Sequence, residues 1–248
     1  MNQAEYQANN PYAQFGNVVA EAPVDVRRAF IRKTYTHLMA AVYGFVALVY
    51  LLFAMGVDEW MLSMLGHGQW TWLIVLGAFM AVSWIADSWA RSSTSLGMQY
   101  AGLFLYVLAE AVIFLPLLHF ASQASVNFGG TNVGVIPAAA ITTLLVFAGI
   151  TAFAFVTKKD FSFLGGILGI AGIGAFALIV IATLFGLSLG VWFMWAMVVF
   201  AGAYILYSTS NILHQYRTDQ YVAASLALFA SVALLFWYVI QIFMSSRD

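Results

Sequence analysis

The chain has 248 residues, of which 63% are hydrophobic and 8% are charged, and its formal net charge is −1. Soluble domains carry about 25% charged residues because their surface faces water, so this composition excludes an ordinary soluble protein and predicts a surface that faces lipid. The near-zero net charge argues against a nucleic acid partner, and the absence of cysteine excludes disulfides, thiol catalysis and cysteine-based metal sites.

Residues 1–29 are predicted to form a disordered cytosolic tail followed by an interfacial approach to the bilayer. Residues 1 to 24 are rich in Asn, Gln, Ala and Tyr and have neither helical nor strand periodicity. Charged residues then cluster from Asp25 to Lys33, just before the first apolar run. Two interpretations of the tail remain open: a leader without a role, or a handle for a partner or a protease.

Residues 30–248 contain seven apolar runs, each long enough to cross a membrane. A helix needs about 20 residues to cross a hydrocarbon core of about 30 Å, and the runs lack the alternation of barrel strands. The predicted fold is therefore an all-α integral membrane domain with seven transmembrane helices. The predicted spans are residues 34–56, 70–87, 98–118, 135–157, 163–185, 191–213 and 221–243.

The positions of Lys and Arg predict the orientation of these spans. If the N-terminus is cytoplasmic, all nine Lys and Arg residues except Arg247 fall in cytoplasmic segments. The positive-inside rule then predicts a multi-pass protein with a cytoplasmic N-terminus and a C-terminus on the opposite side.

Small residues predict which helix faces pack together, because they let backbones approach closely in lipid. The fifth run has Gly165, Gly169 and Gly172 on one stripe. The inner half of the seventh run is also rich in small residues, which predicts that the other helices enclose it: Ala223, Ala227, Ala230, Ser231 and Ala233.

Glu110 is the acidic residue that lies well inside a predicted span. It is about 12 residues from the inner end of the third run, or about 18 Å, which places it near the middle of the bilayer. An acid at this depth is usually protonated, paired or turned toward water, and no Lys or Arg lies at a matching depth. We expect Glu110 to be neutral, and two roles remain open: a proton-linked or cation-linked role, or a structural hydrogen bond.

Other polar residues lie at the ends of the spans. Asp87 and Arg91 are four residues apart at the inner end of the second span, a spacing that predicts a helical ion pair. The sixth run ends in four consecutive polar side chains, from Ser208 to Asn211, and Asn211 is expected to face protein rather than lipid. Three histidines lie near span ends and do not converge by spacing, so no metal site is predicted: His37, His119 and His214.

Residues 186–190 match the Gly-x-Ser-x-Gly pattern of serine hydrolases around Ser188. That pattern requires a strand before the serine and a helix after it, whereas here it falls in a short turn between two membrane helices. We therefore predict no catalytic residue and no enzyme activity.

Two stretches resemble the Bax inhibitor-one (TMBIM) family: residues 158–166, KKDFSFLGG, and residues 209–214, TSNILH. The chain's end, residues 246–248, resembles the bacterial YccA branch, known as a modulator of the FtsH membrane protease. The resemblance covers about residues 30–248 and implies six helices around a buried seventh.

The resemblance also bears on ion conduction. Calcium-leak members of the family are described as carrying two paired aspartates, one in each of the last two spans. The matching positions here are Ser208 and Ser231, and neither is acidic. Two nearby acids can share a proton and act as a pH gate, but two serines cannot. Glu110 matches an acid common in the family, although Ala111 stands where glycine is usual.

Two functional hypotheses follow. The first is a bacterial inner-membrane protein that binds and modulates an FtsH-type protease, with the N-terminal tail as the gripped segment and the C-terminus in the periplasm. The alternative is a calcium or proton leak channel or transporter with Glu110 as the titrating group. No cofactor is predicted, and the candidate ion or proton site is Glu110, Asp87, Ser208, Asn211 and Ser231.

Overall fold

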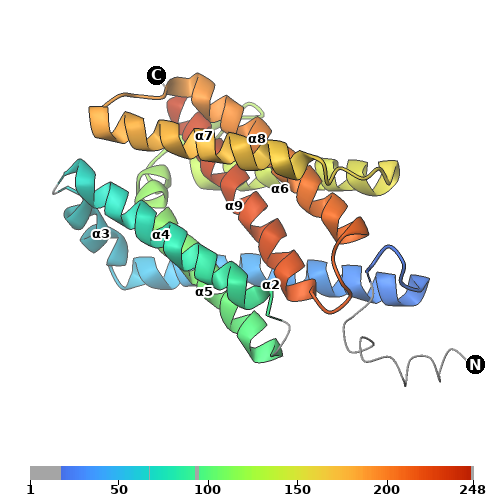
Figure 1. Ribbon diagram of the computed structural model, residues 1–248. Helices are drawn as coiled ribbons and strands as arrows, with labels where there is room; N and C mark the ends of the chain where they lie inside the picture. The colour runs from blue at the N-terminus through green and yellow to red at the C-terminus, as the bar shows by residue number, and fades with distance from the viewer. Residues whose placement is uncertain (1–17, 67, 93–94, 247–248) are drawn as a thin grey trace, which may run out of the picture.

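The computed structural model describes residues 18–66, 68–92 and 95–246. Seven helices in this part of the chain are long and apolar enough to cross a membrane, which confirms the predicted all-α membrane fold. They lie together as one bundle (Figure 1). The seven helices are α2 (Val24–Ala54), α4 (Gln69–Ala90), α5 (Leu96–Ser122), α6 (Val135–Thr157), α7 (Leu164–Phe185), α8 (Gly190–His214) and α9 (Tyr221–Ser245).

The first span is the one whose start differs most from the prediction. Helix α2 begins at Val24, directly after Pro23, rather than at residue 34. Asp25 lies in its first turn, where a negative charge interacts favourably with the unpaired N–H groups of a helix start. The charged stretch before the apolar run is therefore a helical extension of the first span.

Two connections between spans are also structured. Helix α3 (Val57–Leu65) follows α2, and a hairpin of β1 (Ser125–Phe128) and β2 (Thr131–Gly134) joins α5 to α6. Gly129 and Gly130 form its turn with φ of 61° and 87°, a left-handed conformation that glycine adopts without strain. The segment after α5 is therefore a short antiparallel sheet.

Helix α9 is the enclosed helix. Within its apolar window 56% of residues are buried, against 50% for α5 and 17% or less for the other spans. Helix α9 packs against α2, α4, α5, α6 and α8, while α7 packs on α8 and α4. The prediction of a central seventh helix is therefore confirmed, with five of the other six spans packed closely against it, and α9 runs through the middle of the bundle in Figure 1.

Glycines allow close helix contacts at two places. A Cβ atom added to Gly165 of α7 would lie 2.8 Å from the Tyr207 hydroxyl, whereas one added to Gly169 would have no neighbour within 4 Å. The closest approach is between α4 and α5, where a Cβ on Gly102 would lie 2.5 Å from the Ala86 carbonyl oxygen. The predicted glycine stripe of α7 is thus a contact only in part, and the tightest crossing lies elsewhere.

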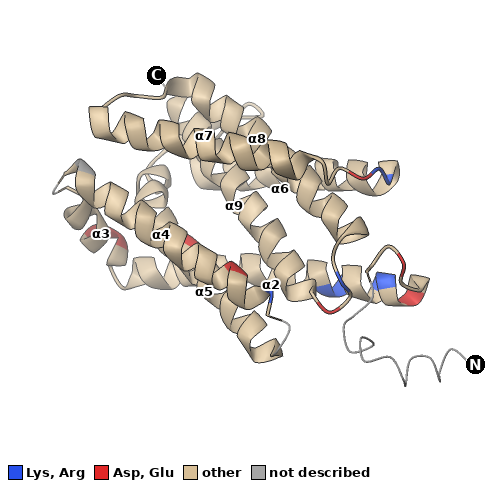
Figure 2. Cartoon of the chain, viewed as in Figure 1, with Lys and Arg blue, Asp and Glu red and all other residues tan. Residues whose placement is uncertain are grey.

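The charged side chains divide the bundle into two ends. Figure 2 shows the Lys and Arg residues gathered at the end where α2 begins and α4, α6 and α8 finish. We call this the basic end and the other the distal end. The basic residues described there are Arg27, Arg28, Arg32, Lys33, Arg91, Lys158, Lys159 and Arg217.

Candidate functional site

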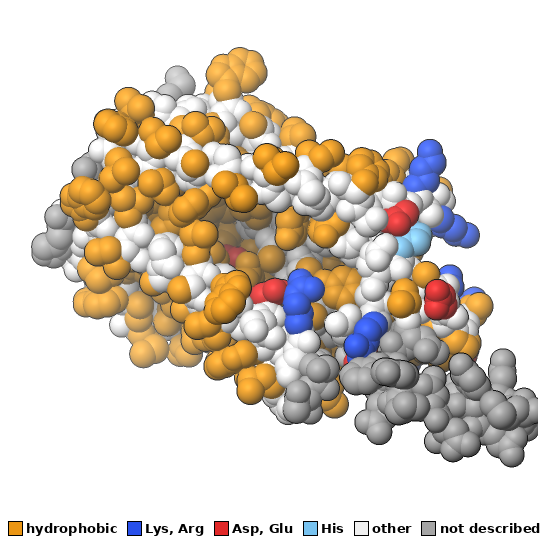
Figure 3. Space-filling model, in the orientation of Figure 1, with side chains coloured by type: hydrophobic (Ala, Val, Ile, Leu, Met, Phe, Trp, Pro, Cys, Tyr) orange, Lys and Arg blue, Asp and Glu red, His pale blue; other side chains and the backbone are white. Residues whose placement is uncertain are grey.

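A cavity of about 730 Å³ lies between α4, α5, α7, α8 and α9. We call it the main cavity. The space-filling view is hollowed on this face, and an acidic side chain is visible within the hollow (Figure 3). Small residues of α7 and α9 line the cavity and leave its volume unfilled: Gly172, Ala175, Ala182, Ala230 and Ala233. Much of the remaining wall is aromatic, with Trp72, Phe79, Phe114, Phe176, Phe193, Phe200 and Trp237.

Glu110 of α5 is the carboxyl group that lines the main cavity. The residue is 6% exposed, and Tyr106, one helical turn earlier, lines the same cavity. Among the described residues that line the cavity there is no Lys, Arg or His. A carboxyl group in this setting needs a proton or a bound cation to remain stable.

Ser208 of α8 and Ser231 of α9 meet inside the bundle. Their hydroxyl oxygens are 3.3 Å apart, and the two residues are 2% and 1% exposed. The Ser231 hydroxyl donates to the Ala227 carbonyl oxygen at 2.7 Å. In the hydrogen bond between the two serines, Ser208 is therefore the donor and the Ser231 oxygen is the acceptor. The two positions implied by the family resemblance are thus in direct contact, as a hydroxyl pair rather than an acid pair.

A second pocket, of about 210 Å³, lies between the serine pair and the basic end. We call it the basic-end pocket. Its lining is mostly polar: Arg91, Tyr204, Tyr207, Ser208, Asn211, Gln215, Tyr216, Gln220 and Ala227. The Oδ1 atom of Asn211 is buried without a hydrogen-bond partner among the described residues, so it is an acceptor available to this pocket. Asn211 therefore faces protein, as predicted.

Tyr204 and the serine pair separate the two spaces. Tyr204 lines both, Ser231 lines the main cavity and Ser208 lines the basic-end pocket. We call these three residues the partition. Tyr204 is not among the site residues predicted from the sequence. The aromatic rings at Phe200, Tyr204 and Tyr207 nevertheless form a helical stripe that marks one face of α8.

Asp87 lies apart from the other candidate residues. Its Oδ2 atom is 2.8 Å from Nε of Arg91, which confirms the predicted ion pair, and the two side chains are 39% and 50% exposed. Asp87 does not line either pocket, but Arg91 lines the basic-end pocket. The pair therefore lies at the rim of this pocket, at the end of α4.

The segment before α2 is anchored at the basic end. The Val19 N–H donates to the Tyr216 carbonyl oxygen at 2.9 Å, and the Arg27 guanidinium donates to the carbonyl oxygens of Val19 and Ala20 at 3.1 and 2.6 Å. Val19 is fully buried, and burial raises the pKa of the Tyr216 phenol to about 12. The expectation of disorder is therefore wrong for residues 18–22, and residues 1–17 lie outside the described part of the chain.

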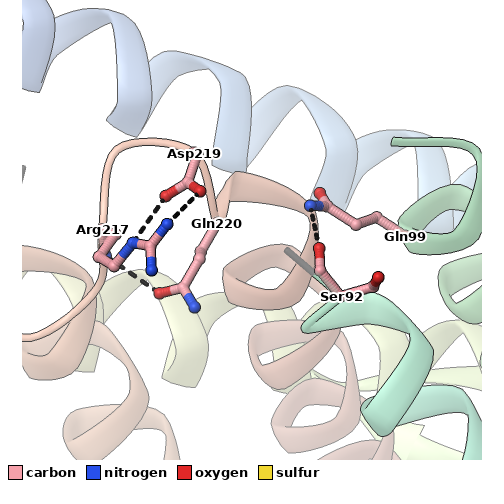
Figure 4. A network of polar contacts seen from close by, with 5 residues as sticks. All are labelled: Ser92, Gln99, Arg217, Asp219 and Gln220. Carbon is pink, nitrogen blue, oxygen red and sulfur yellow. Dashed lines mark hydrogen bonds and ion pairs between the residues drawn. The ribbon is translucent and has the colours of Figure 1, made fainter. Parts of the chain in front are cut away.

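Polar contacts hold the turns around this anchor (Figure 4). The Arg217 guanidinium donates to both carboxylate oxygens of Asp219, at 3.1 and 2.7 Å, and the Arg217 N–H donates to Gln220 at 3.1 Å. In the neighbouring turn, the Gln99 amide donates to the Ser92 carbonyl oxygen at 2.8 Å. The α8–α9 turn is thus internally braced, and the Gln99 side chain at the start of α5 is tied to Ser92 just after α4.

Comparison with known proteins identifies the family. The profile of the family described as "Inhibitor of apoptosis-promoting Bax1" (Bax1-I) matches residues 27–248, all seven spans except the start of α2. The chain belongs to the Bax inhibitor family. Relatives that share most of their length with it include Bax inhibitor 1 of Schizosaccharomyces pombe, 29% identical over 96% of this chain and 85% of the relative.

Two further relatives extend the range of the Bax inhibitor family. Protein lifeguard 4 of Mus musculus is 27% identical over 92% of this chain and 89% of its own length. An uncharacterized protein of Pseudomonas aeruginosa is 38% identical, but over 44% of this chain and 49% of its own length. Since both long matches named here are eukaryotic, membership of the bacterial YccA branch stays a prediction.

Proposed function

We propose that this protein is a gated conduit through which a proton or a small cation crosses the membrane, with Glu110 as the group that takes it up. The observation that carries this proposal is the arrangement of the two pockets. The main cavity reaches Glu110 and Ser231, the basic-end pocket reaches Ser208, and Tyr204 lines both. A closed path of this kind requires a rearrangement of the partition before anything passes.

The chemistry of the partition favours a proton over calcium. Calcium takes six to eight oxygen ligands, whereas the partition offers three hydroxyl groups, two of which bond to each other. Hydroxyl groups both donate and accept hydrogen bonds, so with intervening water they can pass a proton along a chain. The linings of the two pockets contain four such hydroxyl groups and one carboxyl group. The hydroxyl groups belong to Tyr106, Tyr204, Ser208 and Ser231, and the carboxyl group belongs to Glu110.

A liposome assay tests this function. The purified protein is reconstituted with a pH-sensitive dye inside, and proton entry is driven by a potassium diffusion potential. We expect wild type to acidify the lumen and Glu110→Gln to lose most of the flux, because the amide cannot take up a proton. Glu59→Gln, the same change at an exposed acid on α3, should behave as wild type.

The assay also separates the possible ions. A calcium dye in place of the pH dye reports calcium entry, which we expect to be much slower than proton entry. Wild-type protein that moves neither ion, or a Glu110→Gln flux equal to that of wild type, would overturn the proposal.

We also propose that the basic end lies in the cytoplasm of a bacterial cell, with the protein in the inner membrane and the C-terminus in the periplasm. It is supported by the gathering of Lys and Arg at the basic end (Figure 2) and by the positive-inside rule. The chain has no cysteine, so single replacements such as Lys159→Cys and Ser188→Cys give an unambiguous test. A membrane-impermeant maleimide added to intact spheroplasts should label position 188 and not position 159, and the reverse pattern would refute the orientation.

A second function, modulation of an FtsH-type protease, is supported by the YccA-like end of the sequence and by the anchor at the basic end. Because residues 18–22 are held against the α8–α9 turn, residues 1–17 are joined in sequence to a fixed point at the end proposed to be cytoplasmic. We expect deletion of residues 2–15 to lengthen the half-life of the protein and to weaken its co-purification with the protease. Unchanged half-life, binding and turnover of other protease substrates would exclude this role.

A further inference from the structure

We propose that the main cavity is a binding site for a lipophilic organic cation, such as an ammonium or phosphonium group carried on an apolar body. This inference goes beyond ion conduction, because it requires binding in the closed state and no passage through the partition. The volume of the main cavity, about 730 Å³, falls within the range of about 300–1,000 Å³ that is typical of small-molecule sites.

The charge of the cavity selects the sign of the ligand. Glu110 is the carboxyl group in the lining, and no basic side chain lines the cavity in the described part of the chain. Tyr106, one helical turn from Glu110, lines the same cavity but carries no charge. A bound cation would supply the missing positive charge in a region of low dielectric, where an ion pair is stronger than in water. An anion would find no such partner, because the carboxyl group is either neutral or negatively charged.

The aromatic wall explains why the cation would be organic rather than a metal ion. Tyr106 and Phe114 lie one helical turn on either side of Glu110 and line the same cavity. The ring of Trp237 meets the ring of Phe114 edge to face, with centroids 5.0 Å apart. The faces of aromatic rings attract cations within about 6 Å, and they also bury apolar groups. A carboxyl group set among aromatic rings therefore suits a charge that is spread over an apolar body.

The position of the cavity is consistent with a ligand that enters from lipid. The hollow is visible on an outer face of the bundle whose surrounding side chains are largely apolar (Figure 3). An acyl chain of a lipid would fill the apolar volume but would leave Glu110 without a charged partner. The combination of open apolar walls and an unpaired acid thus favours an amphiphilic cation over a neutral lipid.

Two ions of the same shape and opposite charge test the inference. Tetraphenylphosphonium and tetraphenylborate are titrated into the full chain in lipid nanodiscs, and binding to protein-free nanodiscs is subtracted. We expect saturable 1:1 binding of the phosphonium and at least tenfold weaker binding of the borate. Equal affinities, or no saturable phosphonium binding, would overturn the proposal.

Two variants locate the site. Glu110→Gln should weaken phosphonium binding at least tenfold, and Gly172→Leu, which fills the cavity from α7 while keeping the acid, should do the same. Glu59→Gln is the matched control and should bind as wild type does. If Glu110→Gln fails to fold, Gly172→Leu is compared with wild type alone. A folded variant of either kind that binds the phosphonium as tightly as wild type would show that the ligand binds elsewhere. Failure of proton transport would leave this result untouched, because the assay measures binding alone.

Discussion

The crossing of α4 and α5 at Gly102 gives the sharpest test of the packing. In Gly102→Ala the added Cβ would lie 2.5 Å from the Ala86 carbonyl oxygen and 2.6 Å from the Ala90 nitrogen. Both neighbours are backbone atoms, so no side chain can turn away. The helices must move apart by about 0.9 Å, the difference between 2.5 Å and an ordinary contact of 3.4 Å. This would also displace two walls of the main cavity.

The expected magnitude combines two opposing effects. Replacing glycine by alanine inside a helix stabilises it by about 1 kcal/mol, whereas forcing a methyl group into a closely packed contact costs about 1–3 kcal/mol. Helices α4 and α5 form the most extensive helix pair of the bundle, so moving them apart disturbs many contacts. We therefore take the packing cost from the upper part of the range of about 1–3 kcal/mol. We expect Gly102→Ala to be less stable than wild type by about 1–2 kcal/mol.

Gly169→Ala is the matched control, because a Cβ at this position of α7 has no neighbour within 4 Å. Unfolding of both variants and wild type in mixed micelles with rising dodecyl sulfate, followed by tryptophan fluorescence, gives their relative free energies. The expected order of stability is Gly169→Ala at or above wild type, then Gly102→Ala well below it. If the two variants were equally stable, the helix crossing described here would be incorrect.

Three further predictions concern the connections at both ends of the bundle. The Ser162 N–H bonds to Asp160 and holds the pKa of that carboxyl below its usual range, so its contribution to stability is present at neutral pH and is lost as the pH falls through the lowered pKa. Asp160→Asn should flatten the acid-induced fall in protection of the Ser162 amide, measured by hydrogen exchange, and an unchanged profile would contradict this. Arg27→Ala should free residues 18–22 and speed their cleavage by added protease several-fold, whereas Arg28→Ala, at an exposed neighbour, should not. A fluorophosphonate probe should leave Ser188 unlabelled, and labelling detected by mass spectrometry would revive the hydrolase interpretation.

The sequence by itself determined the seven spans and which of them is enclosed. Inside lipid the backbone must satisfy its own hydrogen bonds, so an apolar run of sufficient length has to be a helix, and α6 has the predicted bounds of residues 135–157. Small residues also identified α9 as the enclosed helix, because only they allow several neighbours to approach one backbone. The spans and the enclosed helix could be predicted because both depend on the residues within a single segment.

Only the tertiary structure decided which faces meet. The outer faces of these helices are as apolar as the inner ones, with Ile170 and Trp192 exposed and Leu228 buried, so periodicity does not mark the contact side as it does in water. The α4–α5 crossing at Gly102, the partition at Tyr204 and the aromatic cavity around Glu110 arise from the rotation and crossing of separate helices. Such contacts join residues far apart in the chain, and no single segment contains the information that brings them together.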